Sequence, residues 1–279
     1  MRTRTRRTAG GGIVLAGGMG VAAHWNASQQ SRPPFARPRR KATAARRRSA
    51  PRNELPVSVV AISHSQRRAA PEVPVAAVIH HGVDPASFPV GPGTGGYVMF
   101  LGRMNPDKGA HRAIAVARAA GKQIVLAAKM WEPAKRRYFT ECVEPLLGPD
   151  AVYVGDVGGV RKLGLLANAE ALLNPIRWPE PFGLVMIEAL VCGTPVLTFA
   201  EGAAPEIVEH GRSGFLCDDE DDMAAAVATC ARLVDRAESR ARVEACFSTE
   251  RMVADHLTRV RLPWSDASGS CAGAVVNTA

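Results

Sequence analysis

Short apolar runs alternate with longer amphipathic segments along the chain from residue 57 to residue 261. The runs, such as VSVVAI (57–62) and ALLN (171–174), are continuously apolar and rich in valine, isoleucine and leucine. Strands of this kind are typical of parallel sheets that carry helices on both faces. The pattern therefore predicts an α/β fold with a doubly wound, Rossmann-like parallel sheet and additional C-terminal helices.

The expected strands cover residues 57–62, 75–79, 97–101, 123–128, 151–154, 171–174, 195–199 and 214–217. The expected helices cover residues 108–121, 133–147, 160–168, 183–191, 205–210, 220–234, 238–246 and 249–261. Ligands of such sheets bind beyond the carboxyl ends of the strands. The candidate chemistry should therefore lie in the loops that follow the strands, and three of these loops carry informative residues.

Charge divides the chain into two parts. Residues 1–53 hold 13 of the 35 lysines and arginines and no acidic residue, which leaves 22 bases against 26 acids and a net charge of −4 in residues 54–279. A nucleic-acid-binding domain carries its basic surface on the folded body, so no specific nucleic-acid partner is expected. Residues 1–53 are predicted to be a disordered basic leader.

Two other interpretations of this leader stay open. Paired Arg6 and Arg7 before the Gly-rich apolar run 9–23 resemble an export signal, and an arginine-rich tail can bind polyanions or membrane surfaces. The sequence contains no run of about 18 apolar residues, so no transmembrane helix is predicted. Six cysteines at irregular spacings form neither a zinc motif nor a disulfide framework. They favour small buried residues in a reducing compartment, the cytoplasm.

The loop after the strand at 97–101 has the features of an anion site. In its sequence, GRMNPDKG (102–109), Gly102 is expected to turn the chain sharply off the strand, and Arg103 and Lys108 precede a helix. A helix N-terminus with two cations suits a diphosphate. The alternative is that both are solvated loop charges.

The loop NPIRWPEPFGLVMIEAL (174–190) holds two candidate carboxylates. Glu180 precedes a helix that starts near Phe182, and Glu188 follows at nearly the same azimuth. Gly183 leaves room for backbone N–H groups to touch a ligand. Glu188 lies in an apolar stretch where a carboxylate needs hydrogen-bond donors, which a sugar or ribose diol supplies. The alternative makes Glu180 a helix-start acid and Glu188 a solvent-facing residue.

A third loop, EGAAPEIVEHGRSGFL (201–216), is expected to be mostly scaffold. Gly202 turns the chain after a strand, and this first turn should lie beside the loop at 174–190. Three further motifs are set aside: GPGTGG (91–96) precedes a strand instead of following one, the acids at 219–221 favour a helix start, and the histidines at 80–81 favour plain turn structure. No metal site and no cofactor are expected.

Taken together, these segments resemble the donor-nucleotide domain of retaining glycosyltransferases with the GT-B fold, of the family-four or group 1 type. The matching pieces occur in the family's order and spacing. They are VIHHGVD (78–84), GRMNPDKG (102–109), NPIRWPEPFGLVMIEAL (174–190), GTPVL (193–197) and APEIVEHGRSGFL (204–216). The chain departs from the family at His81, where asparagine is more common.

The resemblance implies a function for each motif residue. Gly102, Arg103 and Lys108 should bind the diphosphate of a nucleotide-sugar, and Glu188 should hold its ribose. Glu180 should act at the sugar as the catalytic carboxylate, and the backbone at 182–184 (Phe182, Gly183 and Leu184) should contact the sugar and the phosphates. The base should lie near 130–131 and 154–157. The implied reaction transfers a hexosyl group to an acceptor hydroxyl with retention and without a metal.

The resemblance also implies a domain division. Residues 54–90 resemble the end of an N-terminal acceptor domain and the interdomain linker, residues 91–262 the donor-binding domain, and residues 263–279 a flexible tail. An acceptor domain needs roughly 100–200 residues, so most of it is expected to be missing and the acceptor is unknown. The chain is then the donor half of an enzyme, alone or with a separate acceptor-domain partner. The alternatives are a non-catalytic nucleotide-sugar-binding module and a truncated, inactive fragment.

Overall fold

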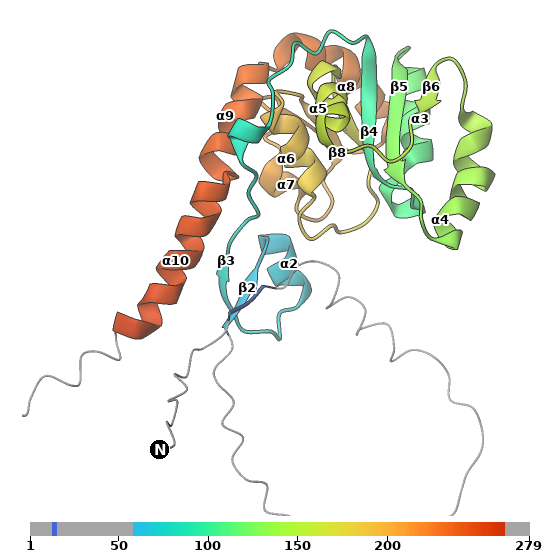
Figure 1. Ribbon diagram of the computed structural model, residues 1–279. Coiled ribbons are helices and arrows are strands. Elements are labelled where there is room, and N and C mark those ends of the chain that lie inside the picture. The colour runs from blue at the N-terminus through green and yellow to red at the C-terminus, as the bar shows by residue number, and fades with distance from the viewer. Residues whose placement is uncertain (1–12, 16–57, 266–279) are drawn as a thin grey trace, which may run out of the picture.

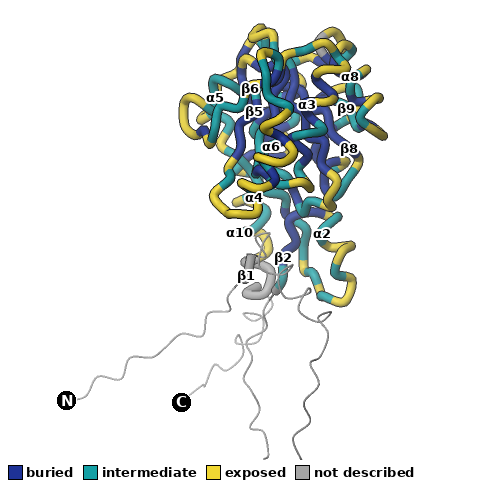
Figure 2. Tube along the Cα trace, turned by 90° about the vertical axis from the view of Figure 1, so that its right-hand side faces the viewer, coloured by how far each residue is buried: buried dark blue, intermediate teal, exposed yellow. Residues whose placement is uncertain are grey.

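The computed structural model describes residues 13–15 and 58–265 (Figure 1). Within them, a six-stranded parallel sheet with helices on both faces forms the main body, and a three-stranded parallel sheet lies beside it. Buried segments gather in the six-stranded sheet, whereas the chain around α2 is mostly intermediate or exposed (Figure 2). The predicted doubly wound α/β class is confirmed.

The strands are β1 (Ile13–Leu15), β2 (Ser58–Ala61), β3 (Val75–Val78), β4 (Tyr97–Arg103), β5 (Gln123–Lys129), β6 (Ala151–Tyr153), β7 (Leu172–Asn174), β8 (Val196–Phe199) and β9 (Gly214–Cys217). The α-helices are α2 (His64–Ala69), α3 (Ala110–Ala119), α4 (Pro133–Tyr138), α5 (Gly159–Asn168), α6 (Leu184–Val191), α7 (Ala204–Ile207), α8 (Glu220–Leu233), α9 (Arg236–Cys246) and α10 (Thr249–Ser265). Short 3₁₀ turns occur at η2 (Pro85–Ser87), η3 (Pro106–Lys108) and η5 (Glu144–Leu146), and a π-turn at η4 (Phe139–Val143).

The large sheet has the order β6-β5-β4-β7-β8-β9. The chain therefore winds outward in one direction from β4 and in the other from β7, so these two neighbours form the topological switch point. The crossover helices that follow the two strands, α3 and α6, pack on opposite faces. This divergence opens a crevice beyond the carboxyl ends of β4 and β7.

Adjacent residues of each strand enter different hydrophobic layers. Met99 and Leu172 pack with α5, α6 and α9, whereas Phe100 and Leu173 pack with α3 and α8 on the other face. All four side chains are buried. Both faces being covered explains why these strands are continuously apolar in sequence.

Several element predictions differ from the structure. Residues 13–15, in the expected disordered leader, form β1 and pair with β2, while 1–12 and 16–53 lie outside the described residues. The expected helix at 133–147 is α4 followed by η4 and η5, because Pro145 cannot donate a hydrogen bond to continue an α-helix. Helix α3 starts at Ala110 instead of residue 108, since η3 precedes it.

The small sheet is fastened to the main body by one carboxylate. Glu206 of α7 accepts hydrogen bonds from the backbone N–H groups of His64 (2.9 Å) and Ser65 (2.8 Å), at the start of α2. The same carboxylate contacts Nε2 of His80 at 2.8 Å. Burial raises the pKa of Glu206, but these hydrogen bonds outweigh it and the net shift is downward. Glu206 thus links the two sheets through charged hydrogen bonds, and we call these contacts the Glu206 latch.

The segment after β3 is also joined to the C-terminal helix. The N–H of Val83 donates to the carbonyl of Phe247, and the N–H of Thr249 donates back to the carbonyl of Val83. Arg251 of α10 donates to the carbonyl of His80 at 2.6 Å. Helix α10 therefore starts beside the residues that connect the two sheets (Figure 1).

None of the described helices is long and apolar enough to cross a membrane. The described cysteines are all free, and burial raises the pKa values of Cys192, Cys217 and Cys230 to about 11, 12 and 12. These three fit the expectation of small buried residues. Cys142 and Cys246 are exposed and do not fit it.

We expect Glu206→Ala to speed amide hydrogen exchange at His64 and Ser65 by roughly tenfold or more, because both N–H groups lose a charged acceptor. The matched control is Glu209→Ala, which removes a more exposed carboxylate three residues later. Equal exchange rates at the two amides in both variants would contradict the latch.

Candidate functional site

A cavity of about 530 Å³ opens beyond the carboxyl ends of the strands at the switch point. It is lined by all eight residues that the sequence assigned to the site, namely Gly102, Arg103, Lys108, Glu180, Phe182, Gly183, Leu184 and Glu188. The fold therefore brings together two loops that are separated by about 70 residues of chain. Their roles toward a ligand stay predictions.

The first loop does not begin as expected. Gly102 still belongs to β4 and pairs with Ala128 of β5, so the prediction that it turns the chain is wrong. The strand ends at Arg103, and the turn is completed by η3 and by Gly109 with φ +77°. Gly102 instead lines the cavity as strand backbone without a side chain.

Lys108 and Glu180 both line the cavity, and their side chains are in direct contact. Their side chains form an ion pair, with exposed fractions of only 12% and 21%. Burial and the nearby Arg103 lower the pKa of Lys108 to about 8, against the opposing effect of Asp107. An anionic ligand that enters the cavity would raise the pKa of Lys108, since an opposite charge favours its charged form.

The second loop reaches the cavity through its backbone. Gly183 has φ +98°, and a Cβ there would lie 2.5 Å from Cε of Met186. Helix α6 begins directly after it, and Leu184 and Val185 of its first turn, where helix N–H groups lack intrahelical partners, line the cavity. The ring of Phe182 is buried and packs edge-on against His81 at 5.2 Å. Side-chain packing at Phe182 therefore fixes the start of α6.

Glu188 has a partner that the sequence did not indicate. Its Oε1 lies 2.8 Å from Nζ of Lys162 on α5, and both side chains are about one-fifth exposed. Glu188 is thus mostly buried instead of solvent-facing, and Lys162 already satisfies its charge. The pair depends on the packing of α5 against α6, which sequence spacing does not reveal.

The backbone of Gly202 lies against the backbone of Glu180. A Cβ at Gly202, whose φ is +58°, would lie 2.4 Å from both the N and the O of Glu180. The N–H of Ala203 donates to the carbonyl of Glu180 at 3.0 Å. The prediction that the turn after β8 lies beside the second loop is confirmed, because β7 and β8 are neighbours.

The cavity also contains residues that the sequence analysis did not assign to it. His81, Lys129 and Lys162 line it. Burial and the electrostatic effect of the neighbouring His256 and His80 lower the pKa of His81. The only sequence signal for Lys129 was its position at the end of β5.

Four other expectations concern residues in or near this cavity. Residues 130–131 do not line the cavity, and the side chain of Trp131 is 72% exposed, so the base contact expected there stays a prediction. Of 154–157, Asp156 and Val157 line it. Asp219 caps α8 by accepting from the N–H of Asp222 at 2.8 Å, which confirms the helix-start interpretation of 219–221. His80 is bound to Glu206 and is structural, as expected of this turn.

Residues 89–245, more than half of the chain, match the model of the family Glycosyl transferases group 1. The chain belongs to this family. Among characterised relatives, this group 1 chain is 29% identical to glycogen synthase of Mycobacterium tuberculosis over 64% of its length and 44% of the relative's. It is 31% identical to the phosphatidyl-myo-inositol mannosyltransferase of Mycolicibacterium smegmatis, over 63% of its length and 49% of the relative's. The chain thus spans about half the length of these curated relatives.

Solved glycosyltransferases share the fold of this group 1 member. AviGT4, a glycosyltransferase of avilamycin A biosynthesis, is 32% identical with a TM-score of 0.61, over 73% of this chain and 62% of that one. HepE of Anabaena, solved with UDP-glucose, is 22% identical with a TM-score of 0.63, over 77% and 65%. These likenesses confirm the expected GT-B relationship of the six-stranded sheet.

We expect Gly202→Ala to destabilise the group 1 domain by about 2 kcal/mol or more, because the new Cβ meets the backbone of Glu180 and the left-handed conformation disfavours alanine. The matched control is Gly211→Ala, since Gly211 has φ +80° but nothing within 4 Å of its Cβ position. Thermal or chemical denaturation measures both variants. An equal loss of stability in the two would show that the contact with Glu180 costs nothing.

Proposed function

We propose that the cavity binds a nucleoside-diphosphate sugar and that the chain supplies the donor-binding half of a retaining, metal-independent hexosyltransferase. The observation that carries this proposal is the convergence of Arg103, Lys108 and the start of α6 on one cavity that Glu180 and Glu188 also line. That HepE was solved with UDP-glucose supports the same ligand class for this chain.

The cationic end of the cavity suits the diphosphate. Arg103 and Lys108 supply positive charge, and the first turn of α6 supplies N–H donors. Charge that develops on the departing diphosphate during transfer would be stabilised by the same groups. These groups supply the stabilisation that a metal ion provides in other transferases, which is the basis for proposing metal independence.

Glu180 is placed to act on the sugar. Its carboxylate is adjacent to Lys108, so a diphosphate bound at Lys108 would hold the attached sugar beside Glu180. Sugar hydroxyl groups would then donate to the carboxylate oxygens. The turn at Gly202 packs directly against the backbone of Glu180. We therefore propose Glu180 as the carboxylate that contacts the transferred hexosyl group.

Glu188 is proposed to hold the ribose. Its carboxylate is paired with Lys162, so it is not a buried, unpaired charge. The two hydroxyl groups of a ribose can occupy the remaining acceptor positions of the carboxylate while Lys162 stays paired. The base would then lie toward Asp156 and Val157, which line the cavity near the end of β6.

The acceptor is proposed to come from outside the six-stranded domain. Each residue assigned above to the donor lies on the segments between Gly102 and Glu188. The acceptor hydroxyl would be presented by a second domain or a separate partner, with residues 91–262 as the donor-binding unit. A cytoplasmic location fits the free thiols of the described cysteines.

A thermal-shift panel tests the proposed ligand class. The full chain is melted with UDP, GDP and ADP and with UDP-glucose, GDP-mannose and ADP-glucose. A ligand at about 100 times its Kd should add about 2.7 kcal/mol of stability, so one base should raise the Tm selectively. A cooperative melt that none of the six ligands shifts would contradict the proposal.

Calorimetry with the nucleotide that binds in that panel separates the two carboxylates. Glu180→Gln should weaken the nucleotide-sugar more than the free diphosphate, because only the sugar contacts Glu180. Glu188→Ala should weaken both by about 1.5–3 kcal/mol, the usual contribution of hydrogen bonds to a charged group. Equal losses for both ligands in Glu180→Gln would remove Glu180 from the sugar site.

Donor affinity should fall as the pH rises through the pKa of Lys108. In the free protein this pKa is about 8, and the bound diphosphate raises it, so binding above pH 8 requires uptake of a proton. From pH 7 to 8.5 we expect about a fourfold loss of affinity for a nucleotide-sugar. Lys108→Met should bind weakly and show a flat profile over this range. The same slope in wild type and variant would exclude Lys108 as its source.

A further inference from the structure

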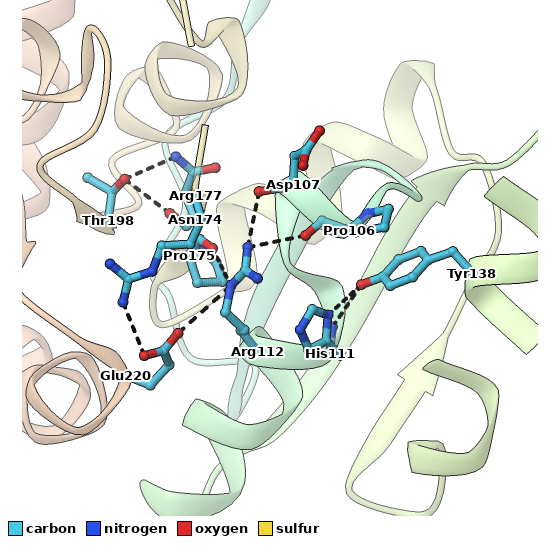
Figure 3. A network of polar contacts seen from close by, with 10 residues as sticks. All are labelled: Pro106, Asp107, His111, Arg112, Tyr138, Asn174, Pro175, Arg177, Thr198 and Glu220. Carbon is cyan, nitrogen blue, oxygen red and sulfur yellow. Dashed lines mark hydrogen bonds and ion pairs between the residues drawn. The ribbon is translucent and has the colours of Figure 1, made fainter. Parts of the chain in front are cut away.

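Arg112 connects the two loops of the site without lining the cavity described above. It lies on α3, and its side chain is 18% exposed. Its Nε donates to the carbonyl of Pro175 at 2.9 Å, and its Nη2 donates to the carbonyls of Pro106 at 3.2 Å and Asp107 at 3.1 Å (Figure 3). One planar guanidinium therefore holds backbone from the loop after β4 and from the loop after β7.

A second contact joins the same two loops. The N–H of Arg177 donates to the carbonyl of Asp107 at 3.0 Å. The guanidinium of Arg177 stacks on Phe199 at 3.8 Å and contacts Glu220 at 3.2 Å. Glu220 also lies 3.8 Å from Nε of Arg112, so one carboxylate contacts both guanidinium groups (Figure 3). The network thus spans the carboxyl ends of β4, β7 and β8 and the start of α8.

We call the contacts of Arg112 with Pro106, Asp107 and Pro175 the clamp. The absence of a side chain at Gly109 makes the clamp possible. A Cβ at Gly109 would lie 2.6 Å from the carbonyl oxygen of Pro175 and 2.6 Å from Nη2 of Arg112. Any larger residue would push the two loops apart or displace the guanidinium. Gly109 directly follows Lys108, so this contact between the loops is one residue from a proposed ligand of the diphosphate.

We propose that Arg112 is a positioning residue for the donor site. By holding the backbone at 106–107 and at Pro175, its guanidinium sets the spacing between Lys108 on the first loop and Glu180 on the second. The inference rests on the proposed donor function, because the consequence of that spacing is simultaneous binding of diphosphate and sugar. A planar fork suits this arrangement, since Nε donates to one loop and Nη2 to the other, whereas lysine offers a single point charge.

The loop contact can be measured without any ligand. In Arg112→Met, which keeps an apolar stem but removes the donors, amide hydrogen exchange at Arg177 should become roughly tenfold faster or more, because its acceptor Asp107 is released. The control is Arg118→Met on the same helix, whose guanidinium contacts Asp150 at 2.6 Å and the Leu146 carbonyl at 2.7 Å, far along the helix from the loops. Arg118→Met should leave exchange at Arg177 unchanged.

Calorimetry with UDP-glucose, GDP-mannose and ADP-glucose tests the consequence for the donor. Whichever of the three binds the wild type should bind Arg112→Met roughly tenfold more weakly or worse, with a smaller loss for the corresponding free diphosphate. Arg118→Met should bind as the wild type does. Arg112→Lys should resemble Arg112→Met in both measurements.

Several results would overturn the inference. Unchanged exchange at Arg177 in Arg112→Met, or equal acceleration in Arg118→Met, would exclude the clamp. Faster exchange with wild-type donor affinity would exclude the positioning role, and full recovery in Arg112→Lys would show that charge alone suffices. If the wild type binds none of the three nucleotide-sugars, the proposed function fails, and exchange at Arg177 still decides whether Arg112 couples the loops.

Discussion

The site depends on the divergence of two neighbouring parallel strands. After β4 the chain passes to the face covered by α3 and α8, and after β7 it passes to the face covered by α5, α6 and α9. The crevice between the two paths brings charged groups close together in a partly buried place, where water screens them weakly. The ion pair of Lys108 and Glu180 spans that crevice, so the strand order determines which charges meet there.

Glycines and backbone contacts hold the charges at that separation. Gly109 lets the first loop approach Pro175, Gly183 starts α6, and Gly202 packs directly against the backbone of Glu180. Each has a positive φ, so another residue would strain the backbone as well as collide with its neighbours. The cavity is therefore largely preformed, which lowers the entropic cost of binding a ligand.

The sequence predicted eight of the nine described strands and eight of the residues that line the cavity, because both follow from local patterns. Apolar runs locate buried strands, and a parallel sheet places the loops after them at one edge. Contacts between elements that are distant in sequence could not be predicted. The pairing of Glu188 with Lys162 requires α5 to lie against α6, and the clamp of Arg112 requires the exact approach of Pro175. The helix expected at 133–147 failed for a local reason, since Pro145 interrupts it.

The most direct test of the donor site is a crystal structure of the chain with UDP-glucose or with whichever nucleotide-sugar raises its Tm. The account predicts that the diphosphate lies against Arg103, Lys108 and the N–H groups at the start of α6. The sugar should contact Glu180, and the ribose hydroxyls should contact Glu188. A nucleotide bound elsewhere in the cavity, with Lys108 still paired to Glu180 and no ribose at Glu188, would contradict the account.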